Sequence, residues 1–203
     1  MRNGTSVLVS LGMLLWLVGC TQQPSQPTST ASHAEHDEHG HDHDHGHDHH
    51  GASPKIASPV APSAEGTHFV MEAEPNDAQD VIAARGTAEN EQEVVLVGRI
   101  GGSENPWVDG RAIFTVVDHS LKACTEIPGD NCPTPWDYCC ATDKLKSSTA
   151  LVKIVGEDGQ PVKTDARELL GVRELTEVVV KGKAQRDDAG NLTVLATGVY
   201  VKK

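Results

Sequence analysis

Residues 93–203 are predicted to form an all-β domain that carries one short helix. Five segments in this part of the chain are rich in β-branched and aromatic residues, and turns containing Gly, Asp or Asn separate several of them. A segment with helix-start and helix-stop residues lies between the third and fourth of these runs. This part of the chain is also long enough for one small domain with a single hydrophobic core.

Each predicted element has its own local signal. Gly101 and Gly102 end the first strand, and the turn at residues 187–191 separates the last two strands. Thr164 or Asp165 can cap the start of the helix, which Gly171 ends. The strands are expected at residues 93–100, 111–118, 149–155, 177–184 and 192–201, and the helix at residues 164–171.

The predicted order of three strands, a short helix and two more strands resembles the order of elements in the OB-fold. The residues that carry the resemblance are Val-Gly-Arg-Ile-Gly-Gly from Val97, Val-Lys-Gly-Lys-Ala from Val180, and the run from Asn191 to Val201. The resemblance implies a five-stranded Greek-key barrel. A different small β-sandwich or barrel remains the alternative.

A cysteine-rich insertion, the segment at residues 118–147, separates the second and third predicted strands. Outside the cytoplasm an even number of cysteines predicts two disulfides. Adjacent cysteines in an extended segment point to opposite sides, so each member of the pair would take a different partner, in either order. The four cysteines are Cys124, Cys132, Cys139 and Cys140.

A metal site is the alternative for the same residues. The four thiols and His119 would provide enough ligands for Zn, Cu(I) or an iron–sulfur cluster. No paired CxxC spacing makes zinc specific. A strained disulfide between the two adjacent cysteines is a third possibility.

Aromatic residues are candidates for a recognition surface, namely Trp107, Trp136 and Tyr138. Trp136 and Tyr138 lie beside the cysteine pair in the string Pro-Trp-Asp-Tyr-Cys-Cys, and packing over the loop or the barrel mouth is the alternative role. The string resembles a motif of envelope lipoproteins, and this resemblance implies no activity.

The first twenty residues have the layout of a secretion signal. Arg2 precedes the mostly apolar run Val7–Val18, which is too short to span a membrane. The ending Leu-Val-Gly-Cys resembles the bacterial lipoprotein signal. That resemblance implies removal of residues 1–19, lipidation of Cys20 and attachment to the membrane of the bacterial cell envelope. Thr21, where some bacteria read an aspartate as an inner-membrane mark, favours the outer membrane.

Residues 20–66 are predicted to form a disordered tether, because they contain few large aliphatic residues. Nine histidines alternate with acidic residues in the tether and could gather Zn, Ni or Cu ions. They are His33, His36, His39, His41, His43, His45, His47, His49 and His50. Residues 67–92 lack a clear periodic pattern, and residues 78–85 within them could form a short helix.

Charge and motif content exclude several function classes. The net charge is −12, and the acidic excess lies in residues 31–93. No excess of Lys and Arg is available for nucleic acid. No nucleophile or carboxylate pair has a recognisable catalytic setting, which argues against an enzyme. We therefore expect a membrane-anchored, non-catalytic binding or assembly module with an unidentified envelope protein or ligand as its partner, and metal handling as the alternative.

Overall fold

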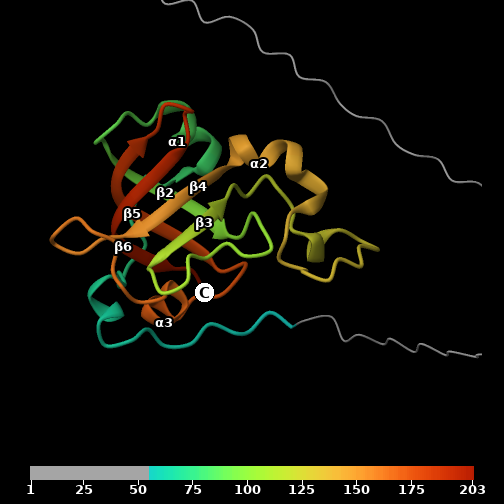
Figure 1. The fold of residues 1–203 in the computed structure, drawn as a ribbon, viewed down its shortest axis with the longest axis horizontal. Helices are drawn as coiled ribbons and strands as arrows, with labels where there is room; N and C mark the ends of the chain where they lie inside the picture. The colour runs from blue at the N-terminus through green and yellow to red at the C-terminus, as the bar shows by residue number, and fades with distance from the viewer. Residues whose placement is uncertain (1–54) are drawn as a thin grey trace, which may run out of the picture. The chain divides into compact units, whose positions relative to one another are not determined.

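The computed structural model describes residues 55–203, whose main feature is a closed five-stranded barrel (Figure 1). The sheet has the order β1-β2-β3-β4-β6-β5, in which β1 (Gln79–Asp80) is a short strand added beside β2, and pairing of β2 with β5 closes the barrel. The barrel strands are β2 (Glu93–Ile100), β3 (Ile113–Val117), β4 (Thr149–Ile154), β5 (Glu177–Arg186) and β6 (Leu192–Val201). The predicted all-β, OB-like barrel is confirmed, and the cysteine-rich segment lies between its second and third strands.

Pairing in the barrel is antiparallel except between β4 and β6. β2 and β5 pair from Glu93 with Lys183 to Arg99 with Glu177, whereas β4 runs parallel to β6. The pairing of β5 with β6 shifts register at Gly182, where a Cβ atom would lie 2.1 Å from the carbonyl oxygen of Leu195. Only glycine allows the two strands to approach this closely.

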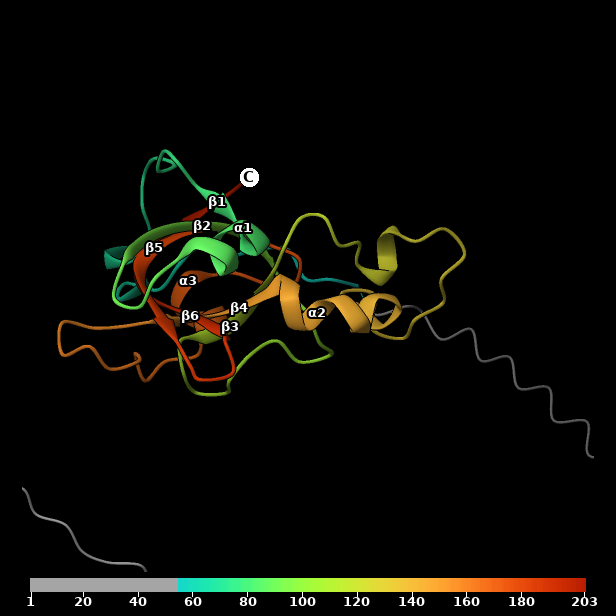
Figure 2. The same ribbon diagram turned by 90° about the horizontal axis from the view of Figure 1, so that it is seen from above.

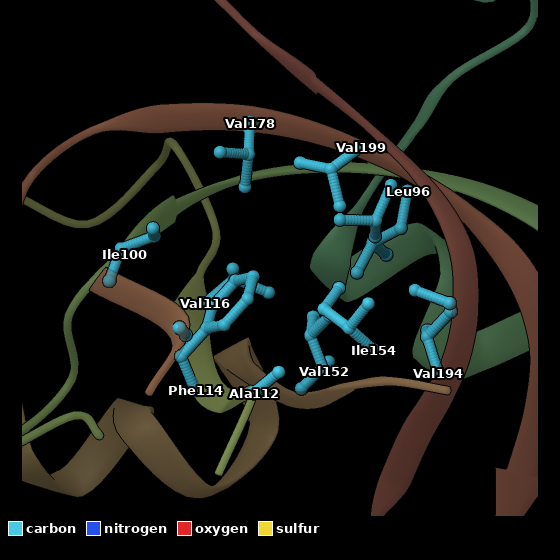
Figure 3. Packing of buried hydrophobic residues seen from close by; sticks show 14 of the residues in the cluster. Leu96, Ile100, Ala112, Phe114, Val116, Val152, Ile154, Val178, Val194 and Val199 are labelled. Atoms are coloured by element: carbon cyan, nitrogen blue, oxygen red, sulfur yellow. The ribbon is translucent and has the colours of Figure 1, made fainter. Parts of the chain in front are cut away.

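Alternating apolar residues of the strands fill the barrel. Burial in β2 alternates along the strand, and Leu96 and Ile100 are fully buried. Figure 3 shows their side chains pointing inward with Phe114 of β3 and Val152 of β4. The strand period of two therefore places one face of each strand in a common core.

Residues 55–203 contain three short α-helices, whereas the sequence predicts one within the barrel domain and allows a second before it. They are α1 (Val81–Thr87), α2 (Thr142–Ser148) and α3 (Ala166–Leu170). α3 has the predicted ends, since Asp165 accepts a hydrogen bond from the Arg167 amide and Gly171 is left-handed. α1 falls in the region where a helix was possible, and α2 replaces the loop predicted before β4.

The segment before α1 is attached to the barrel. The amide of Val60 donates to the Gly171 carbonyl at 2.9 Å, and the amide of Ser63 donates to the Leu169 carbonyl at 3.1 Å. Gly66 is buried, and a Cβ atom there would overlap the Leu169 carbonyl. The sequence predicts a tether as far as residue 66, and these contacts correct that boundary. The two-residue strand β1 (Gln79–Asp80) then pairs in parallel with β2.

The remaining N-terminal predictions lie outside the described residues. They concern the signal peptide at residues 1–19, lipidation of Cys20 and the histidines from His33 to His50. Within residues 55–203, the helices are too short or too polar to cross a bilayer.

Candidate metal centre

The cysteine-rich segment extends from one end of the barrel, where the chain leaves β3 and returns through α2 to β4 (Figure 2). We call residues 118–148 the cysteine loop. It contains two short 3-10 turns, Cys124–Glu126 and Cys139–Ala141, ahead of α2. The first turn carries Cys124 of the candidate site, and the second carries Cys139 and Cys140.

A small apolar cluster attaches the cysteine loop to the barrel. Tyr138 is fully buried and packs with Leu121 and Ala123 of the loop and with Val117 at the end of β3. Its ring lies over Gly101, where a Cβ atom would be 2.7 Å from ring atom Cε2. A side chain at Gly101 would displace the ring, so the glycine after β2 allows the loop to dock.

Arg99 of β2 connects the barrel to the first turn of the loop. Its Nη1 lies 2.8 Å from Oε1 of Glu126, and its Nη2 donates to the Leu121 carbonyl at 3.1 Å. The second carboxylate oxygen of Glu126 accepts from the Ala123 amide at 2.8 Å. The hydrogen bond with Arg99 lowers the pKa of Glu126, which keeps this carboxylate charged.

Backbone hydrogen bonds join the two arms of the loop. The amide of Cys124 donates to the Asp137 carbonyl at 2.8 Å, and the amide of Thr125 donates to the Pro135 carbonyl at 2.9 Å. These contacts bring Cys124 next to Cys139 without using sulfur atoms. The position of the thiols is therefore set by the loop itself.

The four thiols gather around Cys139. Its Sγ lies 3.2 Å from Sγ of Cys124 and 3.9 Å from those of Cys132 and Cys140. Sγ of Cys140 is 3.6 Å from Oδ2 of Asp130. One ligand atom from each of four residues lies within 4.8 Å of the others: Cys124, Asp130, Cys139 and Cys140.

These separations are close to those required by a four-coordinate cation. Tetrahedral zinc with bonds of about 2.3 Å to sulfur places its sulfur ligands roughly 3.8 Å apart. The Cys139–Cys140 separation of 3.9 Å is close to this value, and the Cys124–Cys139 separation of 3.2 Å is somewhat shorter. Small side-chain rotations would therefore complete a site of three thiolates and one carboxylate.

Burial and hydrogen bonding give the thiols different pKa values. Burial raises the pKa of Cys124 to about 12, whereas hydrogen bonds with Thr134 lower the pKa of Cys132. Several thiolates this close together repel one another, so a bound cation would compensate their charge. The cluster can thus hold protons or a positive ion, and the ion binds only as the protons leave.

The two predicted disulfides are not formed. All four cysteines of the loop are free. The shortest sulfur–sulfur distance is 3.2 Å, against about 2.05 Å in a disulfide. Because three sulfur atoms surround one, the arrangement has a single centre instead of two separate pairs.

The structure also changes the predicted ligand set. His119 is not part of the cluster, since its ring lies 3.3 Å from Oδ1 of Asp80 and 3.5 Å from Oε2 of Glu177. Asp130, which the sequence did not single out, takes a place in it. Oδ1 of Asp130 accepts a hydrogen bond from the Cys132 amide, a turn typical of Asp. The run Asp-Asn-Cys, in which Asp130 lies two residues before Cys132, is the sequence pattern that could have indicated this ligand.

Two of the three aromatic candidates are packing residues. Trp107 is 6% exposed, and its indole nitrogen donates to Oε1 of Glu174 at 2.7 Å. Tyr138 is fully buried, so neither residue provides the predicted recognition surface. Trp136 is partly exposed and donates to the Glu104 carbonyl at 2.9 Å. It is the one predicted surface aromatic that remains accessible.

Comparison of the chain with protein-family models and with curated proteins gives no match. The interpretation of the cysteine loop therefore depends on its geometry and chemistry.

Proposed function

We propose that this protein is a metal-binding module of the bacterial cell envelope that holds one Zn(II) or Cu(I) ion in its cysteine loop. The observation that carries the proposal is the convergence of three thiols and a carboxylate oxygen within 4.8 Å of one another. Sulfur-rich donor sets suit these two cations. The proposal keeps the predicted non-catalytic role, with a cation as the ligand.

The construction of the loop supports a metal ion over a structural disulfide. Arg99, Tyr138 and the paired backbone arms already hold the loop in place. A loop that is braced without sulfur bonds leaves its thiols available as ligands. Exposure of Cys139 and Cys140 also gives a cation direct access from solvent.

The N-terminal predictions complete the proposal. Lipidation of Cys20 would tether the module to a membrane, with the outer membrane favoured, and the histidines from His33 to His50 would gather Zn, Ni or Cu ions near it. A flexible histidine run imposes no geometry, so its selectivity would be low. The cysteine cluster would then supply the selective site.

The test is metal titration of reduced, untagged full-length protein whose nine tether histidines are replaced by serine. Native mass spectrometry should show one zinc ion per chain, and Cu(I) should compete for the same site. Cys139→Ser should weaken zinc binding by at least about a hundredfold, because it removes the central ligand. Cys132→Ser is the matched control and should weaken binding less, because Cys132 is outside the four-donor set.

Circular dichroism would confirm that both variants keep the barrel. Absence of bound zinc and Cu(I), or equal affinities of the Cys139→Ser variant and the parent, would refute the proposal.

A further inference from the structure

Exposure differs sharply across the cysteine cluster. Cys124 is 2% exposed and lies at the inner side, whereas Cys139 and Cys140 are exposed. A cation held by these residues would be shielded on one side and open on the other. The exposed ligands are therefore the ones that an incoming molecule can replace.

Cys140 lines an open cavity of about 530 Å³ on the surface of the loop. Leu121 and Ile127 supply apolar walls, and Lys122 and Lys144 supply positive charge. The cavity has no carboxylate in its lining. In residues 55–203, neither lysine forms an ion pair with a carboxylate, as Arg99 and Arg167 do. Lys122 acts electrostatically on the Glu126 carboxylate, whose pKa it helps to lower, so Lys144 supplies the more available charge. The cavity thus combines a ligand thiol with positive charge that can attract an anion.

The cluster also has more donors than a tetrahedral ion requires. Four residues provide the site, and Sγ of Cys132 lies 3.9 Å from Sγ of Cys139 as a fifth donor. If Cys140 leaves the ion, Cys132 can occupy the position. The ion therefore need not lose a ligand before an acceptor takes hold of it.

We propose that the cation leaves this site by way of Cys140, to an anionic acceptor that enters the lysine-lined cavity. This inference rests on the proposed function and makes the module a carrier that transfers its cation. In the first step of the transfer, the bond between the cation and Sγ of Cys140 breaks as a donor atom of the acceptor bonds to the cation. Further donor atoms of the acceptor then replace the remaining ligands, Cys124, Cys139 and Asp130. Each released thiolate takes a proton from water, and no electron moves. The acceptor class is a molecule or protein surface with carboxylate or thiolate ligands.

The test compares two chelators as acceptors from the zinc-loaded full-length protein with the tether histidines replaced by serine. EDTA carries carboxylates and is anionic, whereas TPEN is uncharged. Lys144→Glu should slow zinc transfer to EDTA by about tenfold through lost electrostatic attraction. Transfer to TPEN should change by less than about twofold, and added salt should slow only the EDTA reaction of the parent protein.

Lys146→Glu is the matched control. Lys146 is on the same helix and makes the same charge change, but it lines a different hollow with Arg85 and Arg186. Lys122→Glu repeats the test from the opposite wall of the cavity and guards against a folding defect in the Lys144 variant.

Stoichiometry is measured before the kinetics, so the two proposals fail in different ways. If the parent protein binds no zinc, the proposed function is wrong and the transfer proposal falls with it. If zinc is bound but Lys144→Glu and Lys146→Glu slow zinc transfer to EDTA equally, or neither slows it, the transfer route is wrong and the metal site stands. The route is supported if Lys122→Glu and Lys144→Glu slow zinc transfer to EDTA but not to TPEN, and Lys146→Glu slows neither.

Discussion

Strand β5 pairs with β2 and β6 along most of its length, whereas residues 118–148 contain no strand. The barrel is held by continuous backbone ladders and by a core of alternating aliphatic residues. The cysteine loop depends on a few contacts made by individual residues, among them Arg99, Tyr138 and the Cys124 amide. A change in the barrel core should therefore affect the whole domain, and a change in a loop contact should stay local.

The largest effect is expected from Phe114→Ala in the barrel. Phe114 is fully buried, and its ring lies 6.0 Å from that of Trp107. Its truncation should lower the free energy of unfolding by about 3–5 kcal/mol, because it leaves a cavity that the strands cannot close. Denaturant unfolding followed by far-ultraviolet circular dichroism measures this loss. A loss below about 1 kcal/mol would show that the barrel core repacks freely, against this account.

Arg99→Met should loosen the loop and leave the barrel folded. The change removes the ion pair with Glu126 and the hydrogen bond to the Leu121 carbonyl, at an expected cost of about 1–3 kcal/mol. Hydrogen exchange should accelerate at the amides of Cys124 and Thr125 but stay slow in β5.

Arg167→Met is the control for this experiment. Arg167 pairs with Asp109 and Asp165 and stacks over Trp107, so its loss should not affect the loop amides. Equal acceleration of those amides in both variants would contradict a local role for Arg99.

Asp118, at the junction of β3 and the loop, should make stability depend on pH. Burial alone would raise the pKa of Asp118, but hydrogen bonds from the amides of Ile82 and Ser120 lower it below 3.8. Its contribution is therefore present above its unfolded pKa and is lost as the pH falls through the lower folded value. The free energy of unfolding is measured near neutral pH and below pH 3.8. It should fall less on acidification for Asp118→Asn than for the wild type.

At neutral pH, Asp118→Asn should cost about 1–2 kcal/mol, because an amide can accept only one of the two hydrogen bonds well. Asp143→Asn, an exposed change on α2, is the control and should keep the wild-type pH dependence. If the Asp118→Asn variant also keeps the wild-type pH dependence, other carboxylates determine how stability depends on acid pH.

The sequence predicted the barrel well because its strands carry a local signal. The buried side of β2 follows directly from its alternating apolar residues, and both ends of α3 follow from Asp165 and Gly171. α2 carries no comparable signal, since Leu145 is its only large apolar residue. This helix packs through Leu145 against the Tyr138 cluster, and that contact is not visible in a local pattern.

The same reason limited prediction of the site. The four cysteines were identified from the sequence, but their geometry depends on Arg99, which is distant along the chain, and on the carbonyl of Asp137. His119 was a plausible ligand by spacing, and only the fold shows that Asp80 and Glu177 flank it. Spacing identified the thiols, and contacts between distant segments brought them together.

The smallest effect is expected from Tyr138→Phe. The Tyr138 hydroxyl and Nε of Arg99 are both buried without a hydrogen bond of good geometry among the described residues. The two groups are near each other, and the Arg99 charge partly opposes the rise in the Tyr138 pKa that burial causes. Burial of an unpaired hydroxyl costs free energy, so its removal should change stability by less than about 0.5 kcal/mol or increase it. Tyr138→Ala should instead cost about 3 kcal/mol or more, because the ring fills the space between Gly101 and the loop. Calorimetric melting of both variants measures the contributions of the ring and of the hydroxyl to stability separately. A cost above about 1 kcal/mol for Tyr138→Phe would mean that the hydroxyl is hydrogen-bonded to Arg99, directly or through a water molecule, which would add a polar link between barrel and loop.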